Sequence, residues 1–203
     1  MVRIAVFFYG ALAAIALVLN AVRGAALFPV AGGPELRPAL YLAVACALVT
    51  VAFSRFAEGR YEWAREMKRT FRKYLGTLGI SEVAAIALLS GVSEELFFRG
   101  AVQPALGALF KSDVAGLVVT AVAFACLHIG GRRLVAWTVF AFLLGLVLGW
   151  LFLWSQSLLP PIALHVIVNA LNLRRITRPG AALEPPLGEA SESRSAPAAD
   201  NHA

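Results

Sequence analysis

The sequence is poor in the residues that disulfide-stabilised and zinc-binding domains depend on. It contains 2 cysteines and 3 histidines among 203 residues, and charged side chains make up 15% of it. Cys46 and Cys126 stand alone in apolar runs, so there is neither a disulfide framework nor a CxxC motif, and both are expected to be small buried hydrophobes. The HExxH zinc motif is also absent. These absences exclude the common disulfide-rich and zinc-stabilised folds.

Apolar residues are what the sequence has in excess, at 60% of the chain. A helix needs roughly 20 apolar residues to cross the hydrocarbon core of a bilayer. Six runs approach or exceed that length: Ile4–Val22, Ala39–Phe53, Val83 to about Leu109, Val114 to about Ile129, Leu134–Trp154 and Leu158–Leu173. They predict an all-α fold, a multi-pass transmembrane bundle of about six helices. The first run is too long for a signal peptide and is expected to stay as a helix.

The predicted membrane domain spans residues 1–178. After it, residues 179–203 are rich in Pro, Ala, Ser and Gly and have few apolar side chains to bury, which predicts a disordered tail. His202 lies in this tail and has no expected chemical role.

Basic residues predict the orientation of the bundle, because Lys and Arg near helix ends stay on the cytoplasmic side. They cluster before the first run and after the second, fourth and sixth, with Arg3, the stretch 55–73, Arg132 and Arg133, and Arg174 to Arg178. Both termini are therefore predicted to be cytoplasmic. The formal charge of +6 is an orientation signal and a match to anionic lipid, and no nucleic-acid partner is expected.

Residues 56–75 differ from the membrane runs. Aromatic and apolar side chains recur at helical spacing, while Lys, Arg and Glu fill the other positions. This pattern favours an amphipathic helix on the cytoplasmic surface. The alternative is an extension of the second membrane helix with a solvated face.

Polar side chains at membrane depth are concentrated on three segments: Glu94, Glu95 and Arg99 on one, His128 on another, and His165 and Asn169 on the last. A single His or Asn of this kind commonly joins two helices by a hydrogen bond. Two acids, an arginine, two histidines and an amide together favour a functional site instead.

Helix geometry gives the acidic residues different roles. Glu95 precedes Arg99 by four residues, which is the favourable order for an ion pair along one helix face. Glu94 lies about 100° further round the helix. It can therefore face the bundle interior without Arg99 and act as a general base.

The remaining motifs repeat the four-residue spacing. His165 and Asn169 share one helix face, where they could stabilise a developing oxyanion. Phe124 is placed to shield the ring of His128. The rise of about 1.5 Å per residue puts Glu94 deep in its run and His128 near the cytoplasmic end, so their depths agree only if the third helix starts outside the hydrocarbon or is strongly tilted.

The three patterns, EExxxR at 94–99, FxxxH at 124–128 and HxxxN at 165–169, resemble those of the CPBP family, also called the Abi or CAAX protease family. They follow the family order across a core of about residues 81–173. The resemblance implies a glutamate-dependent intramembrane endopeptidase. Its partners would be the lipid bilayer and a membrane-anchored protein or a peptide with a C-terminal signal, and its place the bacterial inner membrane.

The resemblance also implies a role for each motif residue. Glu94 and His128 would activate the attacking water, and His165 and Asn169 would stabilise the oxyanion. Glu95, Arg99 and Phe124 would support these groups. Within the family, the chain is also similar to the myxosortase-like branch, and an Abi-type role in self-immunity to a bacteriocin is an alternative.

Other functions remain open from the residues themselves. Glu94, His128 and His165 could form a zinc-binding set, although the motif residues are explained without a metal and no cofactor is expected. The same groups could serve a small transporter or proton relay. A scaffold that binds a partner helix without cleaving it is a further alternative.

Overall fold

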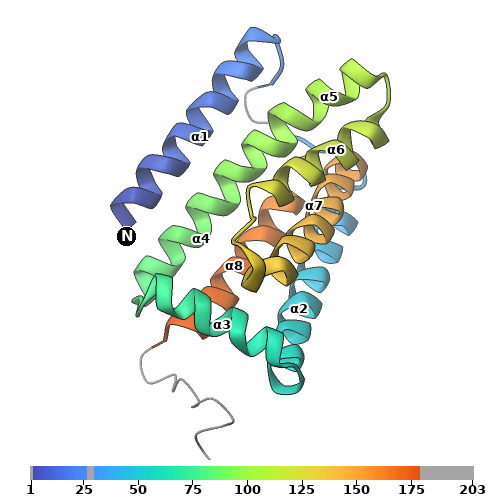
Figure 1. Ribbon diagram of the computed structural model, residues 1–203. Helices are drawn as coiled ribbons and strands as arrows, with labels where there is room; N and C mark the ends of the chain where they lie inside the picture. Colours follow the sequence, from blue (N-terminus) through green and yellow to red (C-terminus); the bar gives the residue numbers. More distant parts are fainter. Residues whose placement is uncertain (1, 27–29, 179–203) are drawn as a thin grey trace, which may run out of the picture.

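The computed structural model describes residues 2–26 and 30–178, and this part of the chain consists of helices and loops without a strand (Figure 1). The all-α prediction is therefore confirmed. The predicted tail, with His202, lies outside the described residues.

The helical elements match the predicted apolar runs closely. Each run coincides with one helical unit, and the third run is a continuous rod of two α-helices joined by a π-helical segment. In chain order the elements are α1 (Val2–Val22), α2 (Leu36–Arg60), α3 (Glu62–Leu75), α4 (Ile80–Glu95), the π-helix η1 (Leu96–Val102), α5 (Gln103–Phe110), α6 (Asp113–Cys126), the 3₁₀ turn η2 (Arg132–Leu134), α7 (Val135–Ser155) and α8 (Leu159–Thr177).

Three helices in the described part are long and apolar enough to be membrane spans on their own: Arg3–Val22, Leu36–Arg60 and Val135–Ser155. A fourth results if α3 and the rod 80–110 are counted as one bent span. The number is below six because α6 has only 14 residues, and because α4 and α8 contain the polar residues of the candidate site. The architecture remains that of a multi-pass helical bundle.

The amphipathic helix α3 begins later than its sequence pattern indicated. Residues 56–60 continue α2, the backbone is extended at Tyr61, and α3 then crosses the lower end of the bundle (Figure 1). The chain bends by 104° between α3 and the rod 80–110. On its charged side, Arg65 and Arg69 lie 2.8 and 2.9 Å from Glu62, and the hydrogen bond from Arg65 holds the pKa of Glu62 below its ordinary value.

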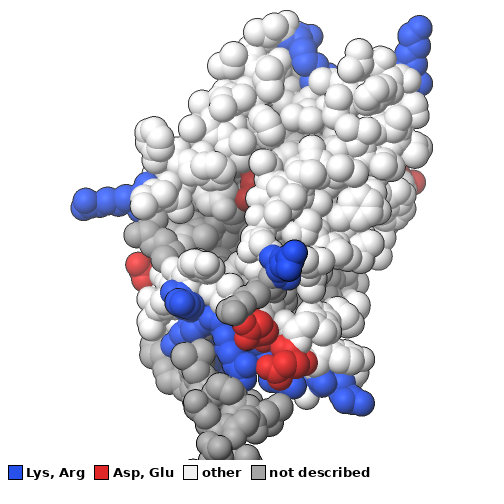
Figure 2. Space-filling model, in the orientation of Figure 1, with Lys and Arg blue, Asp and Glu red and all other residues white. Residues whose placement is uncertain are grey.

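The start of α1 and the end of α8 lie at the same end of the bundle. Ala5 and Leu173 both pack against the small apolar cluster at the start of α4. Figure 2 shows charged side chains gathered at this end, below a broad band that has very few. A band of exposed apolar side chains is what the hydrocarbon of a bilayer requires.

The two cysteines are less buried than expected. Cys46 is partly buried, and Cys126 is exposed. An apolar run on a membrane helix does not reveal which face meets protein and which meets lipid, so burial within the protein could not be predicted from the run alone.

Small residues allow the helices to approach closely. Ala39, Ala43 and Ala47 form a stripe on α2 that is fully buried in the main core, which also contains Leu148 and Leu164. Gly91 on α4 has the same function, because a Cβ there would lie 2.5 Å from Cγ2 of Val166. Such stripes are typical of packed membrane helices.

Gly116 marks the tightest backbone approach, where α6 returns along α5. A Cβ at this position would lie 2.6 Å from the backbone nitrogen of Gly107 and 2.8 Å from the carbonyl oxygen of Gln103. Backbone cannot move aside as a side chain can, so Gly116→Ala should destabilise the protein by about 1–3 kcal/mol. Thermal unfolding in detergent measures this.

Gly10→Ala is the matched control, because no atom lies within 4 Å of a Cβ there. Alanine has the higher helix propensity, so this variant should equal or exceed the wild type in stability. Equal stability of Gly116→Ala and the wild type would contradict the close approach of α5 and α6.

Candidate active site

A cavity of about 320 Å³ lies inside the bundle, and all four residues predicted to be catalytic line it. Glu94 comes from α4, His128 follows α6, and His165 and Asn169 come from α8. The other lining residues are mostly apolar: Tyr9, Phe71, Leu75, Ile86, Ser90, Phe124, Trp137, Phe140, Ala141, Leu144, Val168, Asn172, Leu173 and Ile176. The structure thus brings polar groups from three distant parts of the sequence around one space.

Glu95 and Arg99 form the ion pair predicted from their spacing, with 3.0 Å between Nη1 of Arg99 and Oε1 of Glu95. Both side chains are fully buried. The same carboxylate oxygen lies 2.7 Å from Nδ1 of His165, and Nη2 of Arg99 donates to the carbonyl oxygen of Gly145 at 3.0 Å. The guanidinium also lies over the ring of Phe124, 4.8 Å from its centroid. This network connects α4, η1, α7 and α8.

The π-helical segment η1 begins directly after Glu95 and contains Arg99. A π-helix widens the turn by one residue and is frequent at functional sites. The length of this apolar run is compatible with a kink or a break, but nothing in its residues indicates a π-helix. Arg99 is fully buried within this segment.

Glu94 lies next to this network and faces the cavity. It is 8% exposed, and its Oε2 lies 3.9 Å from Nε2 of His165. That oxygen is buried and has no hydrogen-bond partner among the described residues. Buried carboxylate oxygens are normally satisfied. The cavity is therefore the place from which a water molecule or a substrate group would reach Glu94.

His128 is fixed in position by its own helix end. Its Nδ1 lies 2.7 Å from the carbonyl oxygen of Phe124. A carbonyl can only accept, so Nδ1 holds the proton and Nε2 keeps the lone pair. The ring of Phe124 packs on the imidazole at 4.4 Å between centroids, as the sequence predicted, and Trp137 lies at 5.6 Å on another side.

Asn169 and His165 lie one turn apart on α8 and line the same cavity, as their spacing predicted. The amide nitrogen of Asn169 donates to the hydroxyl of Ser90 at 2.9 Å. An amide group has two N–H donors. One of them is used by Ser90, and the second remains for a ligand in the cavity.

The depths of Glu94 and His128 agree because α6 is short. Glu94 lies 14 residues after the start of α4 at Ile80, and α6 ends at Cys126, partway down the bundle (Figure 1). The loop after α6 therefore holds His128 level with Glu94. The basic residues Arg132 and Arg133 follow His128 closely, so the sequence predicted that His128 lies near the cytoplasmic end. That prediction of depth was misleading, because the loop after α6 lies partway down the bundle (Figure 1).

Several cavity residues were not predicted from the sequence. Tyr9 of α1 lies beside Glu94 and Ser90. Phe71 of α3 packs edge-on against Trp137, with 5.1 Å between ring centroids, and both line the cavity. The surface helix therefore forms part of the cavity wall. A lone tyrosine within an apolar run was the only local signal for any of these residues.

The arrangement of acidic and imidazole groups also bears on a metal site. Within residues 2–26 and 30–178, no three His, Cys, Asp or Glu side chains are close enough together to hold a metal ion. The set Glu94, His128 and His165 lines one cavity without forming such a cluster.

The fold and the cavity define a class of protein: a multi-pass helical membrane protein with a buried carboxylate, imidazole and amide site. Residues 76–171 match the family model of type II CAAX prenyl endopeptidase Rce1-like proteins. Residues 76–171 are thus similar to the CPBP family, as the three motifs predicted. No curated protein and no solved structure matched the chain.

The matched segment begins at Gly76, includes all three motifs, and ends within α8. The matched family implies a peptidase in general, with a membrane-embedded protein as its class of substrate. The helices α1, α2 and α3 lie outside the match, although α1 and α3 contribute Tyr9 and Phe71 to the cavity. The myxosortase-like branch stays a prediction.

Proposed function

We propose that this protein is an intramembrane endopeptidase that uses Glu94 to activate a water molecule against a peptide bond of a membrane-anchored protein. One observation carries the proposal. Glu94 has a buried carboxylate oxygen that makes no hydrogen bond to the described residues, and it shares a cavity with two imidazoles and an amide that are each held by a hydrogen bond. General bases are commonly carboxylates placed in this way within reach of a water.

In the proposed reaction, Glu94 takes a proton from water while the water oxygen attacks the scissile carbonyl carbon. His128 orients this water through Nε2, the ring nitrogen that its hydrogen bond to Phe124 leaves as an acceptor. The tetrahedral intermediate then expels the amine, which receives the proton from Glu94. Each turnover uses one water and returns both catalytic side chains to their starting state.

His165 and Asn169 stabilise the oxyanion of this intermediate. The second N–H of Asn169 is one donor. Nε2 of His165 is the other donor when the imidazole is protonated, with Glu94 and Glu95 on either side of the ring. Because Glu95 is itself held by Arg99, the imidazole is oriented before the substrate arrives. Such preorganised donors usually make the largest single contribution to acyl-transfer catalysis.

The proposal uses no metal, and it places the protein in a bacterial inner membrane. The basic end of the bundle, with the start of α1 and the end of α8, faces the cytoplasm in this proposal. Figure 2 supports this orientation through the concentration of charged side chains at that end.

The function is tested by co-expressing the full chain with membrane-anchored reporter proteins and searching for a shortened product. The product should persist when the purified protein is assayed with a chelator. Loss of cleavage on chelation with recovery on added zinc would favour the zinc-dependent peptidase. An ion flux in proteoliposomes, without any cleavage product, would favour a transporter or proton relay.

Asn169→Ala should lower the cleavage rate by about 10²-fold, because removing one oxyanion donor typically has an effect of that size. The loss should fall on kcat more than on KM, since the donor acts mainly in the transition state. Ser54→Ala on α2 is a control for a polar side chain outside the cavity, because its hydroxyl donates to the carbonyl of Thr50 within its own helix. Equal rates for Asn169→Ala and this control would remove Asn169 from the mechanism.

A further inference from the structure

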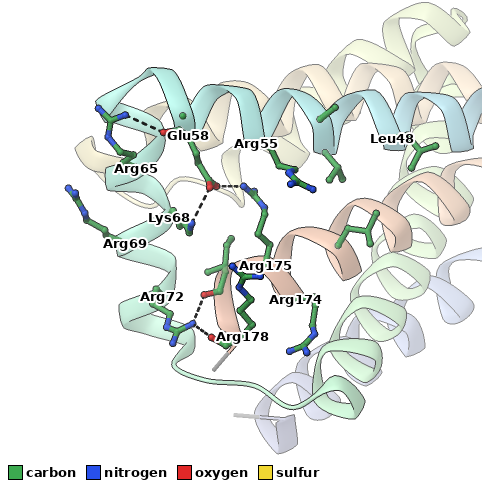
Figure 3. A pocket seen from close by; sticks show the side chains of 15 residues that line it. Leu48, Arg55, Glu58, Arg65, Lys68, Arg69, Arg72, Arg174, Arg175 and Arg178 are labelled. Atoms are coloured by element: carbon green, nitrogen blue, oxygen red, sulfur yellow. Dashed lines mark hydrogen bonds and ion pairs between the residues drawn. The ribbon is translucent and has the colours of Figure 1, made fainter. Parts of the chain in front are cut away.

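A second, larger cavity of about 1130 Å³ lies at the basic end of the molecule, enclosed by α2, α3 and α8 (Figure 3). Its lining contains eight Lys or Arg residues and one acidic residue, Glu58. None of the four proposed catalytic residues lines it. The two cavities share only Ile176 among their lining residues, and the wall of the second is strongly positive.

The single carboxylate is already occupied by two of these cations. Glu58 lies 3.2 Å from Nζ of Lys68 through one oxygen and 2.5 Å from Nη1 of Arg175 through the other. Arg72 is held by carbonyl oxygens at the end of α8, those of Ile176 at 2.7 Å and Arg178 at 2.8 Å. These bonds join α2, α3 and α8 into one frame, which fixes the shape of the cavity.

Two cations in the cavity lack such a partner in the part of the chain that the structure describes. Among the described residues, the side chains of Arg55 and Arg174 have neither an ion pair nor a hydrogen bond, and Figure 3 shows Arg55 directed into the space between α2 and α8. Nε of Arg175 is buried and lacks an acceptor in the same part of the chain. Arginine groups left in this state match the geometry of phosphate oxygens.

The rest of the cavity wall is apolar and identifies the kind of anion. Leu48, Val51 and Leu171 line the side that continues along α2 and α8 toward the apolar band. Leu48 and Leu171 are 55% and 43% exposed. A free phosphate ion has no apolar part that could pack against this wall. A phospholipid has both a charged headgroup and acyl chains.

We propose that this cavity binds the phosphate headgroup of an anionic phospholipid, with its acyl chains along Leu48 and Leu171. Basic pockets between membrane helices bind anionic headgroups in this way. The proposal requires that the basic end of the bundle meet a leaflet that contains anionic lipid. It does not depend on the proposed peptidase activity.

The test measures the thermal unfolding temperature of the full chain, purified in neutral detergent, as phosphatidylglycerol or phosphatidylcholine is added. Phosphatidylglycerol should raise the unfolding temperature in a saturable way, and phosphatidylcholine should have little effect. In Arg55→Gln/Arg174→Gln, the apparent affinity for phosphatidylglycerol should fall by roughly ten-fold or more. The matched control is Arg37→Gln/Lys111→Gln, which removes the same charge from exposed residues at the opposite end and should respond like the wild type.

Two further arms identify the source of the anion. Leu48→Gln should weaken the effect of phosphatidylglycerol. Inorganic phosphate alone should give a much smaller shift than the lipid. The proposal is overturned if inorganic phosphate reproduces the full shift, or if the two double variants lose the lipid effect equally. If Arg55→Gln/Arg174→Gln is unfolded in the absence of lipid, the lipid titrations are repeated with Arg55→Gln alone. Arg55 is exposed, so this single variant should fold.

Discussion

Replacing Glu94 with glutamine should lower the rate of reporter cleavage by roughly 10³-fold or more, within the range that a general base contributes. Glutamine keeps the size of the side chain and cannot accept the proton of the attacking water. The measurement is the rate of product formation by purified protein in proteoliposomes, with wild type and variant at equal concentration.

The same substitution should leave the fold as stable as the wild type, or make it more stable. Oε2 of Glu94 is buried without a hydrogen-bond partner among the described residues, so glutamine removes a desolvated charge while it keeps a polar group beside Tyr9 and His165. The matched control is Glu35→Gln, an exposed glutamate before α2 that makes no side-chain cap hydrogen bond. Full activity of Glu94→Gln would remove the proposed base. Loss of activity together with unfolding would assign Glu94 a structural role instead.

Arg99→Met should destabilise the protein severely, and by more than Gly116→Ala. Arg99 is fully buried, and its replacement leaves Glu95 with His165 as its remaining partner. It also removes the hydrogen bond to Gly145 and the contact with the ring of Phe124. Breaking a buried ion pair on one side typically costs about 3–5 kcal/mol, because the other charge stays buried. Thermal unfolding in detergent would show this as a large fall in the midpoint.

A double variant separates the charge effect from simple loss of packing. Glu95→Gln/Arg99→Met has no uncompensated carboxylate and should recover part of the stability lost in Arg99→Met. A double variant that is less stable than Arg99→Met would indicate that packing, and not the buried carboxylate, dominates. A single variant as stable as the wild type would show that the ion pair does not hold the helices together.

Much of the fold could be predicted because lipid imposes a simple rule. Each apolar run had to become a helix, since backbone groups in hydrocarbon need internal hydrogen bonds. The candidate site could be predicted from the sequence for a related reason. Charged residues are so unfavourable at membrane depth that Glu94, Glu95 and Arg99 stood out, and the spacing of Glu95 and Arg99 directly gave their contact.

What could not be predicted depends on how helices meet. The extra residue in the π-helix has no sequence signature, and the short α6 that brings His128 level with Glu94 ends in an apolar run like any other. Tyr9 lies far from the motifs in sequence, and only the packing of α1 against α4 places it beside Glu94. Phe71 reaches the wall of the catalytic cavity only because the chain bends between α3 and α4. This bend occurs at Gly76, which has a positive φ of 67°.

The most direct test of the proposed peptidase is to identify new protein N-termini in bacterial membranes by mass spectrometry. Cells that contain the wild-type chain are compared with cells that contain Glu94→Gln or His128→Ala at the same level. The account predicts a set of membrane-protein cleavage sites that is present with the wild type and missing with both variants. The same set of termini in all three samples would contradict it.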